Sequence, residues 1–209
     1  MGGAEDRVTR SPRHTPEEAR DEITRCAVEF LEERPFRELT VAKLMAETTL
    51  SRPSFYQYFT DLHELILTLF GEIEDVMRAT ANPWIHGEGE PVEALWESLG
   101  GVVRTTAANG PVLRAVYEAV PLDARLESAW GAFMGRWDES VEARIRAQQD
   151  AGLIPPLDAR LMAVALNKLD ASVLVSEFGR RPHRDPEQVL ATLHRIWVGA
   201  LYSTPGVDD

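Results

Sequence analysis

Six polar side chains stand close together between residues 51 and 58, and their groups are ones that bind phosphates and base edges. They are Ser51, Arg52, Ser54, Tyr56, Gln57 and Tyr58. Hydroxyl and guanidinium groups bind phosphate oxygens, and guanidinium and amide groups also read bases in the major groove. Phe55 and Phe59, four residues apart, would point together into a core. The spacing therefore predicts a helix from about Ser51 with an outward polar face.

The residues before this stretch predict a second short helix that holds it in place. Thr40 is a suitable N-cap, and Val41, Leu44 and Met45 follow with the spacing of one apolar helix face. The segment 47–50 interrupts that pattern. Ser51 is again a good N-cap, and a proline two residues later is tolerated in a first helical turn. Two short helices joined by a tight turn predict a helix-turn-helix.

Composition limits the kinds of protein this chain can be. It has 209 residues, of which 44% are hydrophobic, so a substantial core is expected. The net charge is −12; residues 1–60 contribute −2 and residues 61–209 contribute −10, which disfavours non-specific binding of nucleic acid. Neither a long apolar run nor a signal-like N-terminus is present, so we expect a cytoplasmic protein. The single cysteine, Cys26, allows no internal disulfide.

Three arginines precede the helix-turn-helix. Arg7, Arg10 and Arg13 form a small basic arm. Such an arm would reach a phosphate or the minor groove, or would simply be a solvated tail. The sequence leaves both interpretations open.

The remaining pattern is helical throughout. A capping box at Thr15 and Glu18 predicts a helix to about Glu33, and Asp61 with Glu64 predicts a long one with an apolar stripe. That stripe comprises Leu62, Leu65, Ile66, Leu69, Phe70, Ile73, Val76 and Met77. Prolines and glycines at 82–91 predict a break. Further helices are expected at 91–109, 111–120, 123–151, 158–179 and 185–203. The prediction is an all-α protein of about nine helices, with a DNA-binding domain at 1–60 and a second helical domain at 61–209.

Large apolar side chains recur at helical spacing in the second region. They are Trp96, Trp130, Phe133, Met134, Trp137 and Trp197. Such residues usually form ordinary core. Asn167 and Asp170, three apart on an otherwise apolar helix, favour a binding site instead, because buried polar groups need partners that a ligand can supply.

Other chemistry finds little support in the sequence. The five histidines are scattered and form no pair with ligand spacing, so no metal site is expected. Neither a glycine-rich phosphate loop nor a nucleophile elbow is found, so we expect neither a cofactor nor an enzyme.

The segments TVAKLMAETTL and SRPSFYQYF, followed by a long helix, resemble the DNA-binding domain of the TetR family of bacterial repressors. AWGAFMGRW, AVALNKLDASVLVSEFG and VLATLHRIWVGALY are similar to later helices of the mycobacterial ethionamide-resistance branch of that family. The resemblance implies a homodimer whose third helices enter successive major grooves of a pseudo-palindromic operator. It also implies that Thr40, Tyr56 and Tyr58 contact phosphates. Residues facing the bases would be Ser51, Arg52, Pro53, Ser54 and Gln57; for Arg52 a phosphate contact is slightly favoured over a guanine contact.

The same resemblance implies a hydrophobic tunnel in the second domain. Positions matching Trp96, Trp130, Met134, Trp137, Asn167 and Trp197 line it in the similar repressors. Two positions depart from the pattern. Asp170 replaces an amide, and would pair with a cation such as Lys168 or favour a basic or hydroxylated ligand. Leu62 stands where a phosphate-binding lysine is usual, which removes one anchor.

The resulting hypothesis is a repressor released from its operator by a small apolar ligand. The last two long helices would form a four-helix dimer interface, with small residues allowing close approach. These are Ala163, Val164, Ala171, Val175, Val189 and Thr192. One alternative is a helical small-molecule-binding protein with a degenerate DNA-binding face. A second is an α-helical enzyme that uses Asp170 as a base.

Overall fold

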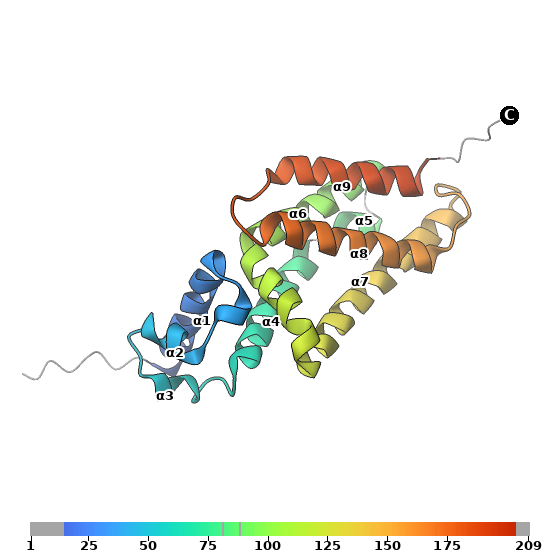
Figure 1. The fold of residues 1–209 in the computed structure, drawn as a ribbon. Coiled ribbons are helices and arrows are strands. Elements are labelled where there is room, and N and C mark those ends of the chain that lie inside the picture. The colour runs from blue at the N-terminus through green and yellow to red at the C-terminus, as the bar shows by residue number, and fades with distance from the viewer. Residues whose placement is uncertain (1–14, 81, 88, 204–209) are drawn as a thin grey trace, which may run out of the picture.

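The predicted all-α architecture is confirmed. A computed structural model describes residues 15–80, 82–87 and 89–203, and these form nine α-helices, two short 3₁₀ helices and no strand. The helices group into a small unit, α1 to α3, at one end of the molecule and a larger bundle at the other (Figure 1). The basic arm of Arg7, Arg10 and Arg13 lies outside the described residues.

The small unit follows its sequence signals closely. Helix α1 (Pro16–Glu33) begins with the predicted capping box, in which Thr15 and Glu18 bond each other's backbone N–H. After a 3₁₀ turn, η1 (Phe36–Glu38), Thr40 caps α2 (Val41–Ala46) by accepting from the Lys43 N–H at 3.2 Å. Helix α3 (Arg52–Phe55) follows. Local propensity and tertiary packing agree at the starts of these helices, which were predictable, whereas α3 ends earlier than the predicted helix.

Helix α4 (Leu62–Thr80) connects the two parts of the molecule. Asp61 accepts from the Glu64 N–H at 2.8 Å, and the Glu64 carboxylate accepts from Thr60, as in a capping box. Most of the predicted apolar stripe is buried, but Val76 is 50% exposed and does not belong to it.

The predicted break at 82–91 is wrong in part, because residues 82–86 form a short helix, α5 (Asn82–His86). Trp84 holds it: its indole is 1% exposed, and its backbone N–H donates to the Ser98 hydroxyl at 2.9 Å. The helix ends before Gly87, which has φ +78°. Long-range burial of one tryptophan thus outweighs the local proline and glycine signals.

The two helices predicted at 91–109 and 111–120 are one continuous helix, α6 (Pro91–Ala119). Pro111 lies inside it, and Gly110 allows α6 to approach α8 closely. A Cβ on Gly110 would lie 2.0 Å from the Phe178 carbonyl oxygen. The Gly-Pro pair therefore marks a helix crossing, and the predicted helix count is right only because a split α6 compensated for a missed α5.

The last helices begin at aspartate caps, as predicted. After η2 (Val120–Leu122) come α7 (Ala124–Asp150), α8 (Ala159–Phe178) and α9 (Pro186–Leu201), capped by Asp123, Asp158 and Asp185. Helices α8 and α9 lie side by side at the end of the molecule remote from α3 (Figure 1).

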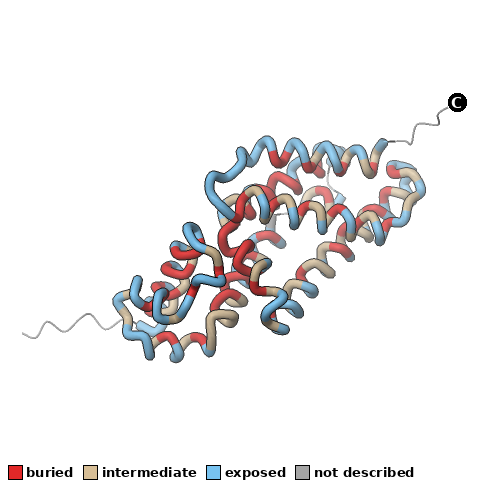
Figure 2. The backbone as a smooth tube through the Cα atoms, viewed as in Figure 1, coloured by how far each residue is buried: buried red, intermediate tan, exposed pale blue. Residues whose placement is uncertain are grey.

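Buried residues form two clusters, visible as red segments inside both parts of the tube in Figure 2. The first joins α1 to α4 with the C-terminal half of α6 and the start of α7. The second joins α5, the N-terminal half of α6, α7, α8 and α9. Movement of α4 or α6 therefore affects the packing of the helix-turn-helix.

Candidate nucleic-acid interface and ligand cavity

Phe55 and Phe59 anchor the helix-turn-helix in its core, as predicted. Their side chains are 0% and 2% exposed, and their ring centroids are 5.6 Å apart. The Arg20 guanidinium, from α1, lies over the Phe59 ring at 5.7 Å. With these two rings fixed, the intervening side chains must face outward or along the surface.

The polar face occupies the short helix α3 and the turn that continues from it. The Gln57 and Tyr58 N–H groups donate to carbonyls three residues back, so the last turn is tighter than an α-helix. Ser51 occupies the N-cap position, but its hydroxyl pairs with that of Ser54 at 2.8 Å and caps no backbone group.

The structure leaves most of the predicted DNA-contacting residues on the surface. Thr40, Ser51, Arg52, Pro53, Tyr56 and Gln57 are exposed, whereas Ser54 and Tyr58 are half-buried. Tyr56, at 57% exposure, stands out furthest among the aromatic residues. Leu62, which stands where a lysine is usual in the similar repressors, instead packs against the first core.

Glu22 positions the turn before α3, and the sequence reading missed it. This buried carboxylate accepts from the Thr49 N–H at 2.6 Å and from the Thr49 hydroxyl at 3.0 Å. The only sequence signal was an acidic residue on the buried face of α1. Its bonds fix the turn that determines where α3 points.

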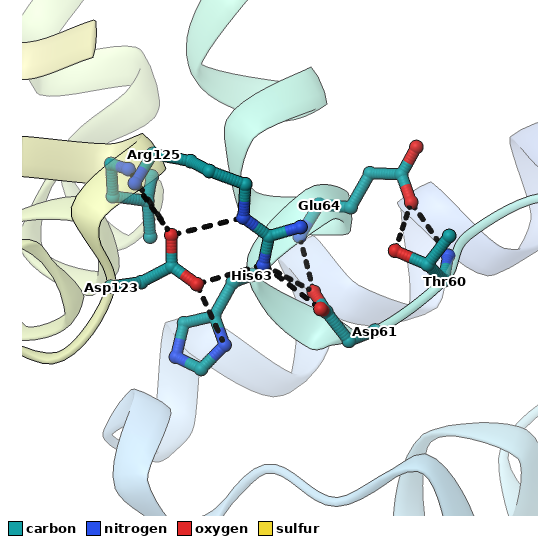
Figure 3. A network of polar contacts seen from close by, with 7 residues as sticks. Thr60, Asp61, His63, Glu64, Asp123 and Arg125 are labelled. Carbon is teal, nitrogen blue, oxygen red and sulfur yellow. Dashed lines mark hydrogen bonds and ion pairs between the residues drawn. The ribbon is translucent and has the colours of Figure 1, made fainter. Parts of the chain in front are cut away.

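A charged network ties the start of α4 to the start of α7 (Figure 3). Arg125 Nη2 lies 2.9 and 3.1 Å from the two Asp61 oxygens and 2.7 Å from Asp123 Oδ2. His63 Nδ1 lies 3.7 Å from the same Asp123 oxygen. The hydrogen bond from Arg125 holds the pKa of Asp123 far below its usual value. The network connects Asp61 to the larger bundle. Asp61 lies just after the polar stretch 51–58, which is called the recognition segment below.

A second connection runs from α6 to the end of α1. Arg114, 7% exposed, donates from Nη2 to the Leu31 and Arg34 carbonyls at 2.8 Å each. Burial lowers its pKa. One turn later, Glu118 accepts from the Phe36 N–H at 3.1 Å. These contacts satisfy carbonyls at a helix C-terminus with a cation, as helix electrostatics favour.

The larger bundle contains an apolar cavity of about 100 Å³. Seven of the eight predicted ligand-binding residues line it: Trp130, Phe133, Met134, Trp137, Asn167, Asp170 and Trp197. Trp96 does not, and its assignment is corrected. It is 41% exposed, and its ring stacks edge-on against His194 at 5.1 Å on the surface.

The lining includes thirteen residues that the sequence reading did not assign. They are Met77, Trp84, Ile85, Leu95, Ser98, Leu99, Val102, Thr106, Leu113, Val141, Ala171, Leu174 and Val175. Most are ordinary apolar residues of α6 and α8, which give no local signal that distinguishes cavity lining from core. Met77 is the most informative of these residues, because through it α4 forms part of the cavity wall.

The two polar residues of α8 that line the cavity have different partners. Asn167 donates to Asp138 Oδ1 at 2.8 Å, whereas both Asp170 oxygens accept from the Trp197 indole N–H at 3.1 Å. Burial raises the pKa of Asp170 to about 7, although the Trp197 hydrogen bond opposes the shift. Lys168 is exposed and makes no ion pair with Asp170, so that alternative for the carboxylate is wrong.

A wider surface groove of about 470 Å³ adjoins the cavity. It lies among α4, α5 and α7 and shares Ile85, Phe133 and Trp137 with the cavity lining. Glu74 of α4 pairs there with Arg136 of α7. The groove therefore gives a ligand a route to the apolar cavity that passes charged side chains.

The small residues expected at a dimer interface are mostly turned inward. Ala163 and Val189 are buried, and Ala171 and Val175 line the cavity. Val164 is half-buried and Thr192 is exposed. The outward face of α8 instead carries Leu161, Ala165 and Ser172, and that of α9 carries Ile196 and Gly199.

Two features are absent from the described residues. None of their helices is long and apolar enough to span a membrane. They also contain no group of three or more His, Cys, Asp or Glu side chains placed to hold a metal ion.

Comparison with solved structures shows the same fold elsewhere. A TetR-family transcriptional regulator from Syntrophomonas wolfei superimposes with a TM-score of 0.72 at 14% identity, covering 93% of this chain and 100% of that one. At such low identity the likeness establishes the fold alone. That regulator therefore shares this chain's arrangement of a helix-turn-helix, a long helix and a helical bundle.

Sequence comparison establishes the family. Residues 95–203 match the model of the C-terminal domain of the transcriptional regulator EthR. The EthR regulator of Mycobacterium tuberculosis strain H37Rv is 29% identical over 184 residues, covering 86% of this chain and 85% of that protein. The one from Mycolicibacterium smegmatis is 26% identical over 203 residues, covering 95% and 93%. The chain belongs to the EthR family of TetR-type transcriptional regulators.

Proposed function

We propose that this protein is a ligand-responsive transcriptional repressor, acting in the cytoplasm and without catalytic activity. Residues 1–60 would bind an operator, and residues 61–209 would bind a small apolar ligand and dimerise. The observation that carries the proposal is the placement of Met77. It lies on the helix that follows the recognition segment, yet it lines the cavity.

The exposed face of α3 supports DNA contact. Arg52, Ser51 and Gln57 are free of the core and would reach base edges or phosphates, together with Pro53 and Ser54. Thr40, Tyr56 and Tyr58 would bind phosphates on either side. Because the whole chain is acidic, the attraction would be local, and specific contacts would contribute a larger share of the affinity than in a basic protein.

A homodimer would present two such faces to a pseudo-palindromic operator. We place the interface on the outward faces of α8 and α9, where Leu161 is 66% and Ile196 is 37% exposed. Ala165 and Ser172 on α8 and Gly199 on α9 leave room for close helix packing. Introducing a charge there with Ser172→Glu should give a monomer with sharply weaker operator binding. An unchanged dimer in sedimentation would place the interface elsewhere.

Ligand would act by binding one arrangement of the helices better than the other. Phe70 of α4 packs against Trp130 and Phe133 of the cavity wall, with ring centroids 5.8 and 5.2 Å away. A ligand that shifts these two rings would therefore displace α4. Because α4 follows the recognition segment directly, the two recognition helices of the dimer would lose the separation that the operator requires.

Fluorescence anisotropy with the DNA that flanks the gene tests this proposal, with random DNA as competitor and a range of salt concentrations. Arg52→Ala and Tyr56→Phe should weaken the specific complex, and Arg52→Ala should lower the salt slope by about one. Arg146→Ala is the control, since Arg146 pairs with Glu142 on the same helix, α7, in the larger bundle. Equal binding to random DNA, or no effect of either variant, would favour a small-molecule-binding protein with a degenerate DNA-binding face.

A further inference from the structure

The cavity contains one carboxylate that lacks a cationic partner. Asp170 is 7% exposed, and among the described residues its only hydrogen-bond donor is the Trp197 indole, which is shared between both oxygens. A carboxylate has about four acceptor positions, so one N–H leaves most of them unused. Buried carboxylates in proteins are otherwise paired or well hydrogen-bonded.

Neighbouring polar groups do not supply what Asp170 lacks. The Asn167 amide nitrogen donates to Asp138, and the Ser98 oxygen accepts from the Trp84 N–H. The described lining contains no lysine, arginine or histidine, and Lys168 is exposed. Asp170 therefore has no cationic partner among the described residues, and ionising it inside this apolar cavity is costly unless a cation enters.

The rest of the lining is suited to a cation with an apolar body. Trp84 and Trp197 pack edge to face at 5.7 Å, and Trp137 and Trp130 complete an aromatic wall. Indole faces attract ammonium groups, most strongly when water is excluded. The cavity volume of about 100 Å³ limits the buried part to a short chain or a small ring.

We infer that the ligand is a small apolar amine, whose ammonium group pairs with Asp170 and whose hydrocarbon part lies among the tryptophans. This inference rests on the proposed ligand-binding function of the cavity and specifies its ligand class. An amide at position 170 would offer a donor and an acceptor to neutral ligands. The carboxylate offers only acceptors when ionised, and so selects a charged donor.

Three four-carbon probes of matched shape test the inference: n-butylamine, n-butanol and butyrate. Their binding to the purified protein, without DNA, is measured by calorimetry and by the fluorescence of the cavity tryptophans at pH 8. Butylamine should bind at least about tenfold more tightly than butanol, a difference of about 1.4 kcal/mol. Butyrate should not bind. Equal or tighter binding of butanol would overturn the inference.

Asp170→Asn and Lys168→Gln form a matched pair of variants. The first should reduce butylamine affinity to that of butanol, whereas the second removes an exposed charge from the same helix and should change nothing. Unchanged butylamine affinity in a folded Asp170→Asn protein would contradict the inference. If that variant does not fold, the three probes on the wild-type protein still decide.

Adding DNA separates this inference from the proposed function. Butylamine that binds and releases DNA supports both. Butylamine that binds through Asp170 without releasing DNA supports the amine site and contradicts ligand-induced release. Release by butanol alone supports the repressor and contradicts the amine site.

Discussion

Arg125 at the start of α7 holds both carboxylate oxygens of Asp61, at 2.9 and 3.1 Å, and so connects the larger bundle to the residue that caps α4. Both side chains are about half exposed, so the pair contributes little to global stability. The pair lies between the recognition segment and the cavity. Its main role is therefore to hold the start of α4 against the start of α7.

Arg125→Ala should therefore weaken operator binding more than it weakens folding. We expect about a fivefold or greater loss of operator affinity, in the range of typical coupling between sites, with little change in Tm. Anisotropy titration and thermal unfolding measure the two effects. Arg160→Ala is the control, because Arg160 pairs with Glu142 between α8 and α7, away from α4. Equal effects of the two variants on DNA binding would refute a special role for Arg125.

The raised pKa of Asp170 predicts how stability depends on pH. Between about pH 4 and about pH 7 the folded protein holds a proton that the unfolded chain releases, so ionisation of Asp170 destabilises the fold as pH rises. The free energy of unfolding should fall relative to Asp170→Asn by up to roughly 1.4 kcal/mol per pH unit over this window. Urea unfolding of both proteins at several pH values measures the difference. Parallel pH profiles would show that Asp170 ionises normally.

Two glycines in helices should respond in opposite ways to alanine. Gly110→Ala places a Cβ against the Phe178 carbonyl and should destabilise the protein by about 1–3 kcal/mol. Gly131→Ala, on the exposed face of α7 with nothing within 4 Å, should stabilise it by about 0.5–1 kcal/mol. Chemical denaturation tests both. A neutral Gly110→Ala would mean that α6 and α8 can separate freely.

The features of the fold that were predictable from the sequence are those for which local signals and tertiary packing agree. The caps at Thr15, Thr40 and Asp123 and the inward pair Phe55 and Phe59 follow from residue type and spacing. These features depend on neighbours within one helical turn. The positions of the two short helices were therefore predictable, although the Ser51 hydroxyl caps no backbone group.

Features that depend on contacts between residues far apart in the sequence were not predictable from it. Pro111 reads as a helix end, yet packing of α6 against α8 keeps the helix continuous. Trp96 and Trp137 look alike in sequence, but only Trp137 faces the cavity. The bonds from Glu22 to Thr49 span 27 residues and have no local signature.

The link between cavity and operator is the central claim, and a cavity-filling substitution tests it without a known ligand. Ala171→Leu adds apolar volume inside the cavity, whereas Ala132→Leu adds the same volume on the exposed face of α7. Operator affinity of the two variants is measured by anisotropy, after sedimentation shows that both are dimers. The account predicts that Ala171→Leu mimics a bound ligand and weakens operator binding by about tenfold or more, while Ala132→Leu binds as wild type. A folded, dimeric Ala171→Leu protein that binds the operator as tightly as wild type would contradict it.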